Sequence, residues 1–172
     1  MVDMSGAEPD RLENFPVTFF AVMMGLLGLA LSMAAAEKAA GSAANVSQFI
    51  LGAAVAVFAV LAFFYTLKLV RHPGAVRAEW NHPVRIAFFP TISISLLLLG
   101  TALAPRVPGA AYVIWSIGVA AQAMLSLSVI ANWIGHRSFQ PLHLSPAWFI
   151  PAVGNVLVPL AGVEFGVIEL SW

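Results

Sequence analysis

The charged residues of this chain are spaced so unevenly that long stretches carry none. An α-helix rises about 1.5 Å per residue and the hydrocarbon core of a bilayer is about 30 Å thick, so about 20 uncharged residues can cross it. Uncharged stretches of that length lie between Lys38 and Lys68, between Arg85 and Arg106, between Arg106 and Arg137, and between Arg137 and Glu164. The chain is therefore expected to cross a membrane several times.

The composition also favours a membrane protein. Of the 172 residues, 60% are hydrophobic and 9% are charged, whereas a soluble domain carries about 25% charged residues. The formal net charge of zero gives no reason to expect nucleic acid as a partner. The absence of cysteine excludes disulfides and thiolate metal sites.

Five apolar stretches are predicted to form transmembrane helices. Short connections with turn or proline chemistry join them, so consecutive helices should pack as antiparallel hairpins. The expected fold class is an all-α integral membrane protein, with a polar leader at 1–14 and, at 164–172, a loop followed by the start of a truncated sixth helix. The predicted spans are residues 15–36, 45–67, 86–104, 109–134 and 147–163.

Basic residues predict the orientation. Loops on the cytoplasmic side of a membrane carry an excess of Lys and Arg. If the N-terminus is cytoplasmic, six basic residues lie inside and two outside. The six are Arg11, Lys68, Arg71, Arg77, Arg85 and Arg137, and the two are Lys38 and Arg106. A cytoplasmic N-terminus is therefore expected.

The first, third and fifth spans begin alike, with a polar residue and a proline before an aromatic-rich run. A shared architecture and ordinary helix starts repeated by chance explain this equally well. Proline inside the third and fifth spans frees backbone carbonyls, which must face protein or water. Water in a pore beside these spans could donate hydrogen bonds to these carbonyls. Alternatively, the prolines form structural kinks at which a neighbouring helix donates them. The polar and proline positions are Pro90, Thr91, Ser93, Ser95, Pro151, Asn155 and Pro159.

The predicted spans hold no Asp, Glu, Lys or Arg, which argues against ion coupling through carboxylates and favours a passive path. The four histidines lie in connections without metal-ligand spacing, so no metal or cofactor is expected. Ser126, Ser128 and Asn132 have no paired base, so an enzyme is not supported, and hydrogen bonds between helices are the expected role.

The basic run 68–85 has two interpretations. It can hold the loop against anionic lipid, or it can raise the anion concentration at a pore mouth, for which Arg85 is the best candidate. Phenylalanines near the cytoplasmic ends of the odd spans either pack against helices and lipid or close a pore by excluding water. They are Phe19, Phe20, Phe88, Phe89 and Phe149.

Three motifs carry a family resemblance. They are residues 15–20 (FPVTFF) leading to Gly25, residues 76–85 (VRAEWNHPVR) leading to Phe88-Phe89-Pro90, and residues 145–155 (SPAWFIPAVGN). Together they resemble the tellurite-resistance/C4-dicarboxylate transporter family, which includes bacterial TehA proteins and plant slow anion channels. The resemblance extends over almost the whole chain after residue 14.

The resemblance implies ten helices in five hairpins around a pore lined by the odd helices, of which this chain would be the first half. It also implies homotrimers that pass small inorganic anions or dicarboxylates such as malate. The Ala-rich composition suggests a bacterial inner membrane as their location. The family's blocking phenylalanine lies on the ninth helix and has no counterpart here. A non-conducting structural or regulatory subunit, or a truncated gene fragment, is the alternative. With Arg85 at the mouth, the candidate pore-lining residues are Phe19, Phe20, Gly25, Phe88, Phe89, Pro90, Ser93, Ser95, Phe149, Pro151 and Asn155.

Overall fold

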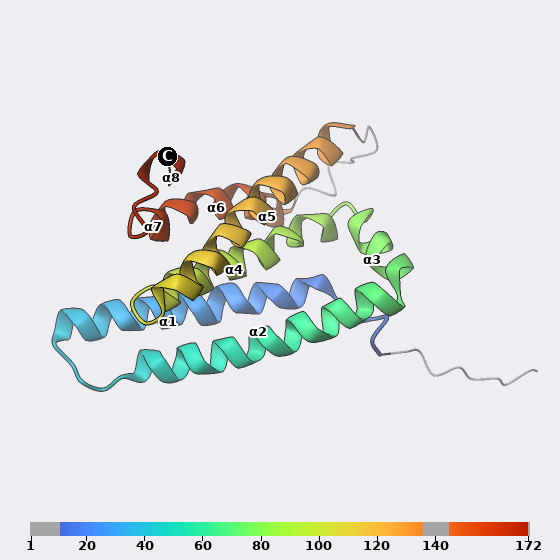
Figure 1. Cartoon of the computed structure of the whole chain (residues 1–172). Helices are drawn as coiled ribbons and strands as arrows, with labels where there is room; N and C mark the ends of the chain where they lie inside the picture. Colours follow the sequence, from blue (N-terminus) through green and yellow to red (C-terminus); the bar gives the residue numbers. More distant parts are fainter. Residues whose placement is uncertain (1–10, 136–144, 172) are drawn as a thin grey trace, which may run out of the picture.

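The computed structural model describes residues 11–135 and 145–171, and every regular element within these residues is a helix (Figure 1). Within these residues, four helices are long and apolar enough to cross a membrane, and a shorter apolar helical segment covers Pro146–Gly162. The all-helical membrane fold expected from the sequence is confirmed, and the protein is a multi-pass membrane protein. The α-helices are α1 (Ala21–Ala40), α2 (Val46–Arg71), α3 (Pro73–Trp80), α4 (Pro90–Leu103), α5 (Pro108–Gly135), α6 (Ile150–Val156), α7 (Val158–Gly162) and α8 (Ile168–Ser171).

Helix α4 lies at the centre of the bundle (Figure 1). Its span is 72% buried inside the protein, against 28% or less for the other three long helices. It contacts α1 on one side and α5, α6 and α7 on the other, whereas α2 packs mainly on α1. The outer helices are apolar on faces that the protein does not cover, as helices in contact with lipid are.

Two hairpins build this bundle. Helices α1 and α2 are joined through Gly41, whose φ of 60° ends α1 in the left-handed conformation that glycine adopts without strain. Helices α4 and α5 approach closely because small residues lie between them. A Cβ at Gly100 would lie 2.8 Å from the Cβ of Trp115, and one at Gly118 would lie 3.1 Å from the backbone nitrogen of Leu97.

Several elements differ from the predicted spans. Helix α1 continues to Ala40 instead of ending at residue 36. Helix α2 continues to Arg71 instead of ending at residue 67, since no helix breaker occurs before Pro73. The connection after it contains helix α3, which the sequence did not predict. The fifth segment is broken at Leu157, because Pro159 has no N–H with which to continue the α6 ladder.

The first, third and fifth segments begin with a 3-10 turn before the α-helix starts. These turns are η1 (Val17–Phe20), η2 (Arg85–Phe88) and η4 (Pro146–Phe149). In each case the proline noted in the sequence lies at or just before the turn. Turn η1 contacts η2, and η2 contacts η4, so the three openings lie together at one end of the bundle. The shared architecture is therefore favoured over a chance repeat.

Candidate functional site

The end where η1, η2 and η4 meet carries an exposed cation and exposed aromatic rings. Arg85 begins η2, its side chain is exposed, and it forms no ion pair with any residue that the structure describes. The backbone N–H groups of Val84 and Arg85 donate to Nδ1 of His82, which holds the turn. Phe19 is 43% exposed and Phe149 is 72% exposed. This end can therefore attract an anion next to apolar rings.

The other predicted lining residues divide into exposed and buried positions. Gly25 and Asn155 are exposed, and Phe88 is half-buried. The buried aromatic residues pack against neighbouring helices: Phe20 meets Tyr65 edge-on at a centroid distance of 5.6 Å, and Phe89 meets Trp80 at 4.8 Å. The remaining buried candidates are Pro90, Ser93, Ser95 and Pro151.

The two predicted pore-lining serines lie inside the packed bundle. The single hydroxyl proton of Ser93 is shared between the carbonyl of Pro90 at 2.8 Å and Oε1 of Gln122 at 2.6 Å. The hydroxyl of Ser95 donates to the carbonyl of Thr91 at 2.6 Å. Both side chains are fully buried. Within this chain they face neighbouring helices, and the pore-lining role of the whole candidate set stays a prediction.

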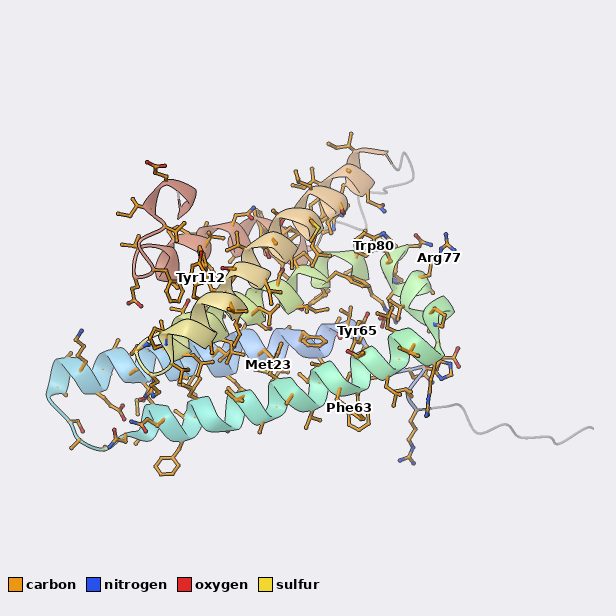
Figure 2. The ribbon with its side chains drawn as sticks, in the orientation of Figure 1. Met23, Phe63, Tyr65, Arg77, Trp80 and Tyr112 are labelled. Atoms are coloured by element: carbon orange, nitrogen blue, oxygen red, sulfur yellow. The ribbon has the colours of Figure 1, made fainter. Side chains whose placement is uncertain are left out.

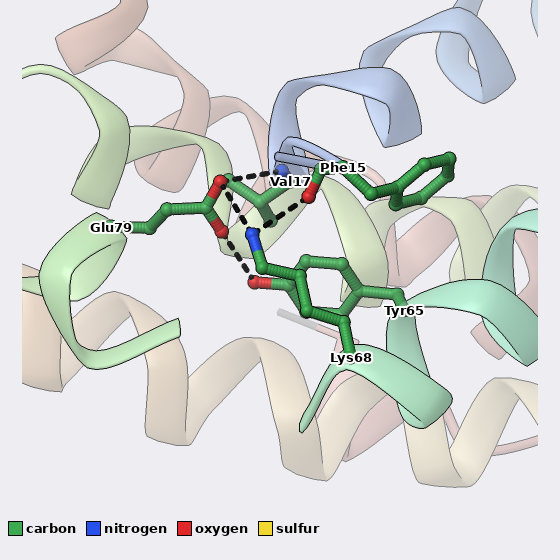
Figure 3. Close-up of polar contacts among 5 residues, drawn as sticks. All are labelled: Phe15, Val17, Tyr65, Lys68 and Glu79. Carbon is green, nitrogen blue, oxygen red and sulfur yellow. Dashed lines mark hydrogen bonds and ion pairs between the residues drawn. The ribbon is translucent and has the colours of Figure 1, made fainter. Parts of the chain in front are cut away.

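A buried ion pair fixes the same end of the bundle (Figure 3). Nζ of Lys68 lies 3.2 Å from Oε1 of Glu79, and the two side chains are 2% and 4% exposed. The Lys68 ammonium also donates to the carbonyl of Phe15 at 2.8 Å. Glu79 accepts from Oη of Tyr65 at 3.0 Å and from the backbone N–H of Val17 at 3.4 Å. The pair thereby ties the start of the first segment to α2 and α3.

This pair corrects two interpretations of the sequence. The basic run 68–85 was treated as a set of charges available to lipid or anions, but the Lys68 charge is neutralised by Glu79 inside the protein. Lys68 also lies within α2, and Glu37 and Lys38 lie within α1, so two spans carry ionisable residues near their ends. Of the run, Arg71, Arg77 and Arg85 keep exposed side chains, and Figure 2 shows Arg77 directed away from the bundle.

A second polar cluster lies in the middle of the bundle, around Gln122 of α5. Its side chain is fully buried. Its Oε1 accepts from the hydroxyl of Ser93 at 2.6 Å, while its Nε2 donates to Ser126 at 2.8 Å and to the carbonyl of Pro151 at 2.9 Å. One amide thus connects α5 to both α4 and α6. Gly154 makes room for it, since any Cβ at that position would collide with the Gln122 amide.

Gln122 was missed at the sequence level, although an amide in a long apolar helix is itself a signal of contact between helices. The expected role of Ser126 is confirmed, because its hydroxyl donates to the carbonyl of Pro151 at 3.1 Å. Ser128 instead bonds within α5, to the carbonyl of Met124 at 2.7 Å.

Helix α5 also satisfies backbone carbonyls of the broken fifth segment. Besides the bonds to Pro151, the indole Nε1 of Trp115 donates to the carbonyl of Val158 at 3.1 Å. Side chains of a neighbouring helix therefore donate hydrogen bonds to the backbone carbonyls of Pro151 and Val158. At these two carbonyls, a kink satisfied by a neighbouring helix is favoured over a water-filled path. In the described part of the chain, no three His, Asp or Glu side chains gather as a metal site would require.

Comparison with known proteins agrees with this architecture. The chain is 32% identical to a tellurite resistance protein TehA homolog of Haemophilus influenzae over 80% of its length, and 28% identical to an uncharacterized transporter of Methanocaldococcus jannaschii over 88%. It is 28% identical to the S-type anion channel SLAH3 of Arabidopsis thaliana over 92% of its length.

The chain covers 42%, 45% and 26% of these three relatives, so it spans less than half of each. The relatives are named as channels, transporters or a resistance protein, none of them as an enzyme. A family model described as voltage-dependent anion channel (SLAC1) matches residues 14–172. With its helical membrane bundle and the three motifs noted in the sequence, the chain belongs to the voltage-dependent anion channel family.

Proposed function

We propose that this chain forms part of a passive path for small anions, including C4-dicarboxylates such as malate, across a bacterial inner membrane. The observation that carries the proposal is the meeting of η1, η2 and η4 at one end of the bundle, where Arg85 is exposed. Apolar surroundings of low dielectric constant concentrate the electric field of an exposed cation, and this field raises the local concentration of anions. The assembled protein is proposed to be a homotrimer, as in the family that the sequence resembles.

The distribution of charge supports a passive mechanism and a cytoplasmic N-terminus. Helices α4, α5, α6 and α7 contain no Asp, Glu, Lys or Arg, so they offer no carboxylate for proton or sodium coupling. Among the described residues, the end that holds η1 and η2 carries four exposed arginines, whereas the opposite end carries two basic residues. The four are Arg11, Arg71, Arg77 and Arg85, and the two are Lys38 and Arg106.

Arg85→Ala is expected to reduce anion flux about fivefold at low ionic strength. One unit charge acting on an anion at about 4 Å in water contributes about 1 kcal/mol, which corresponds to that factor. The measurement is flux of malate, chloride and nitrate into proteoliposomes at a fixed membrane potential. Arg77→Ala, an exposed arginine on α3, is the matched control. Equal flux for Arg85→Ala and the unchanged chain, at equal abundance in the membrane, would remove Arg85 from the path.

A non-conducting structural or regulatory subunit is the second candidate. It is favoured by the complete burial of Ser93 and Ser95, which within this chain line a packed interface and not an open path. Absence of flux from the purified chain, together with copurification of a longer member of the same family, would support this candidate. Selective flux from the purified chain alone would exclude it.

A further inference from the structure

The outer surface of the bundle has an apolar cavity with a cationic rim. Its volume is about 340 Å³, and it is lined by Arg11, Leu12, Phe15 and Phe64. The rings of Phe15 and Phe64 have a centroid distance of 6.1 Å, and Phe15 also contacts Phe19 edge-on at 5.1 Å. Among the described residues, the lining is therefore apolar and mostly aromatic, and its charged side chain is Arg11.

The cavity opens on the face of α2 that the bundle leaves uncovered. Helix α2 is the outermost of the long helices and packs mainly on α1 (Figure 1). Phe64 is 42% exposed and its neighbour Phe63 is 63% exposed. Figure 2 shows Phe63 directed away from the other helices. In a membrane protein, such a surface faces lipid.

The cavity lies near the end of α2, where charged residues resume after the apolar run. Phe64 is followed two turns later by Arg71, which lies on a similar side of the helix because residues seven apart nearly superimpose in projection. Arg71 is exposed and ends α2. Among the described residues near this point, Glu13 is the exposed carboxylate, and Glu79 is paired with Lys68. The exposed arginines Arg11 and Arg71 therefore outnumber the unpaired carboxylate in the described part of the rim.

The protein holds this cavity in shape. The ammonium of Lys68 donates to the carbonyl of Phe15 at 2.8 Å, so the ion pair with Glu79 fixes the backbone of one wall (Figure 3). Phe64 lies on α2, one helical turn before Lys68. Both aromatic walls are thus attached to the same buried pair. A preformed site loses less conformational entropy when a ligand binds.

We propose that this cavity binds one anionic phospholipid, with an acyl chain against Phe15 and Phe64 and the phosphate on Arg11. A free phosphate would gain the contact with the arginine but none from the rings. A zwitterionic lipid would gain the ring contacts but would bring a second cation near the arginines. An anionic phospholipid is the ligand that uses both parts of the cavity.

The test is the effect of added lipid on the purified full chain in neutral detergent. Phosphatidylglycerol is expected to raise Tm, whereas phosphatidylcholine and inorganic phosphate at equal concentration raise it much less, because a ligand stabilises in proportion to its affinity for the folded state. Native mass spectrometry should show one retained phosphatidylglycerol per chain. In Arg11→Gln and Phe64→Ala, the Tm shift is expected to fall by about half or more.

Matched variants distinguish lipid binding in this cavity from general electrostatic attraction of anionic lipid to the protein surface. Arg77→Gln removes an exposed arginine at the same end, and Phe49→Ala removes a 79% exposed ring near the other end of α2. Both should keep the full Tm shift and the retained lipid. Equal loss in Arg77→Gln and Arg11→Gln would overturn the proposal in favour of diffuse electrostatics. An equal shift from inorganic phosphate would identify a simple anion site, and no shift from phosphatidylglycerol would also overturn the proposal.

Discussion

Replacing Glu79 by glutamine is expected to lower the free energy of unfolding by about 3–5 kcal/mol, the usual cost of removing one partner from a buried ion pair. The ammonium of Lys68 would remain inside the protein without its counter-charge, since both side chains are almost completely buried. The hydrogen bonds from Tyr65 and Val17 would weaken as well. Equilibrium unfolding in mixed micelles, followed by tryptophan fluorescence, measures the change.

Glu164→Gln is the control for this substitution. Glu164 is an exposed carboxylate outside the buried cluster, and an exposed charge contributes about 0–1 kcal/mol. The two variants make the same chemical change in different surroundings. If Glu79→Gln and Glu164→Gln lowered the free energy of unfolding by the same amount, the ion pair would not stabilise this bundle.

Gly154→Ala is expected to lower the free energy of unfolding by about 2–6 kcal/mol. The new methyl group would occupy the space of the Gln122 amide. Overpacking of a core costs about 1–3 kcal/mol, and displacing the amide from the carbonyl of Pro151 adds the cost of an unsatisfied buried group, about 1–3 kcal/mol. The same unfolding experiment gives the value.

Gly52→Ala is the matched control, because nothing lies within 4 Å of a Cβ at that position of α2. Alanine there should stabilise the helix by up to about 1 kcal/mol. The double variant Gly154→Ala with Gln122→Ala should show strong coupling, since the second change removes the group with which the first collides. Additive effects in that cycle would mean that the collision does not occur.

The long helices could be predicted from the sequence because they depend on one quantity, the distance between charges. The same reasoning failed at α3 and at Lys68. Lys68 and Glu79 lie eleven residues apart, and they meet because the chain reverses at Pro73 and a short helix brings the carboxylate back. Charge counting treats each residue as solvated, so it has no means of finding such a pair.

Only part of the candidate site could be predicted from the sequence, for a similar reason. The repeated proline motif predicted that three segments begin alike, and the structure places those openings together. The Gln122 cluster could not be deduced, because its partners come from α4, α5 and α6 and no spacing in the sequence links them. Hydroxyl groups such as those of Ser93 and Ser95 mark either a pore or a packed interface, and only the burial of each side chain distinguishes the two.

The 3-10 openings add to the length of the first, third and fifth segments at this end of the bundle. Each is a turn of four residues, which rises about 8 Å as 3-10 helix and about 6 Å as α-helix. A first, third or fifth segment can therefore shorten by about 2 Å at this end while the α-helix beyond keeps its hydrogen bonds. Bilayers differ in thickness by a few Å, and fluorescence quenching of Trp148 in lipids of different chain length would detect the change. Such a change would match the length of a segment to a thinner bilayer without tilting of its helix.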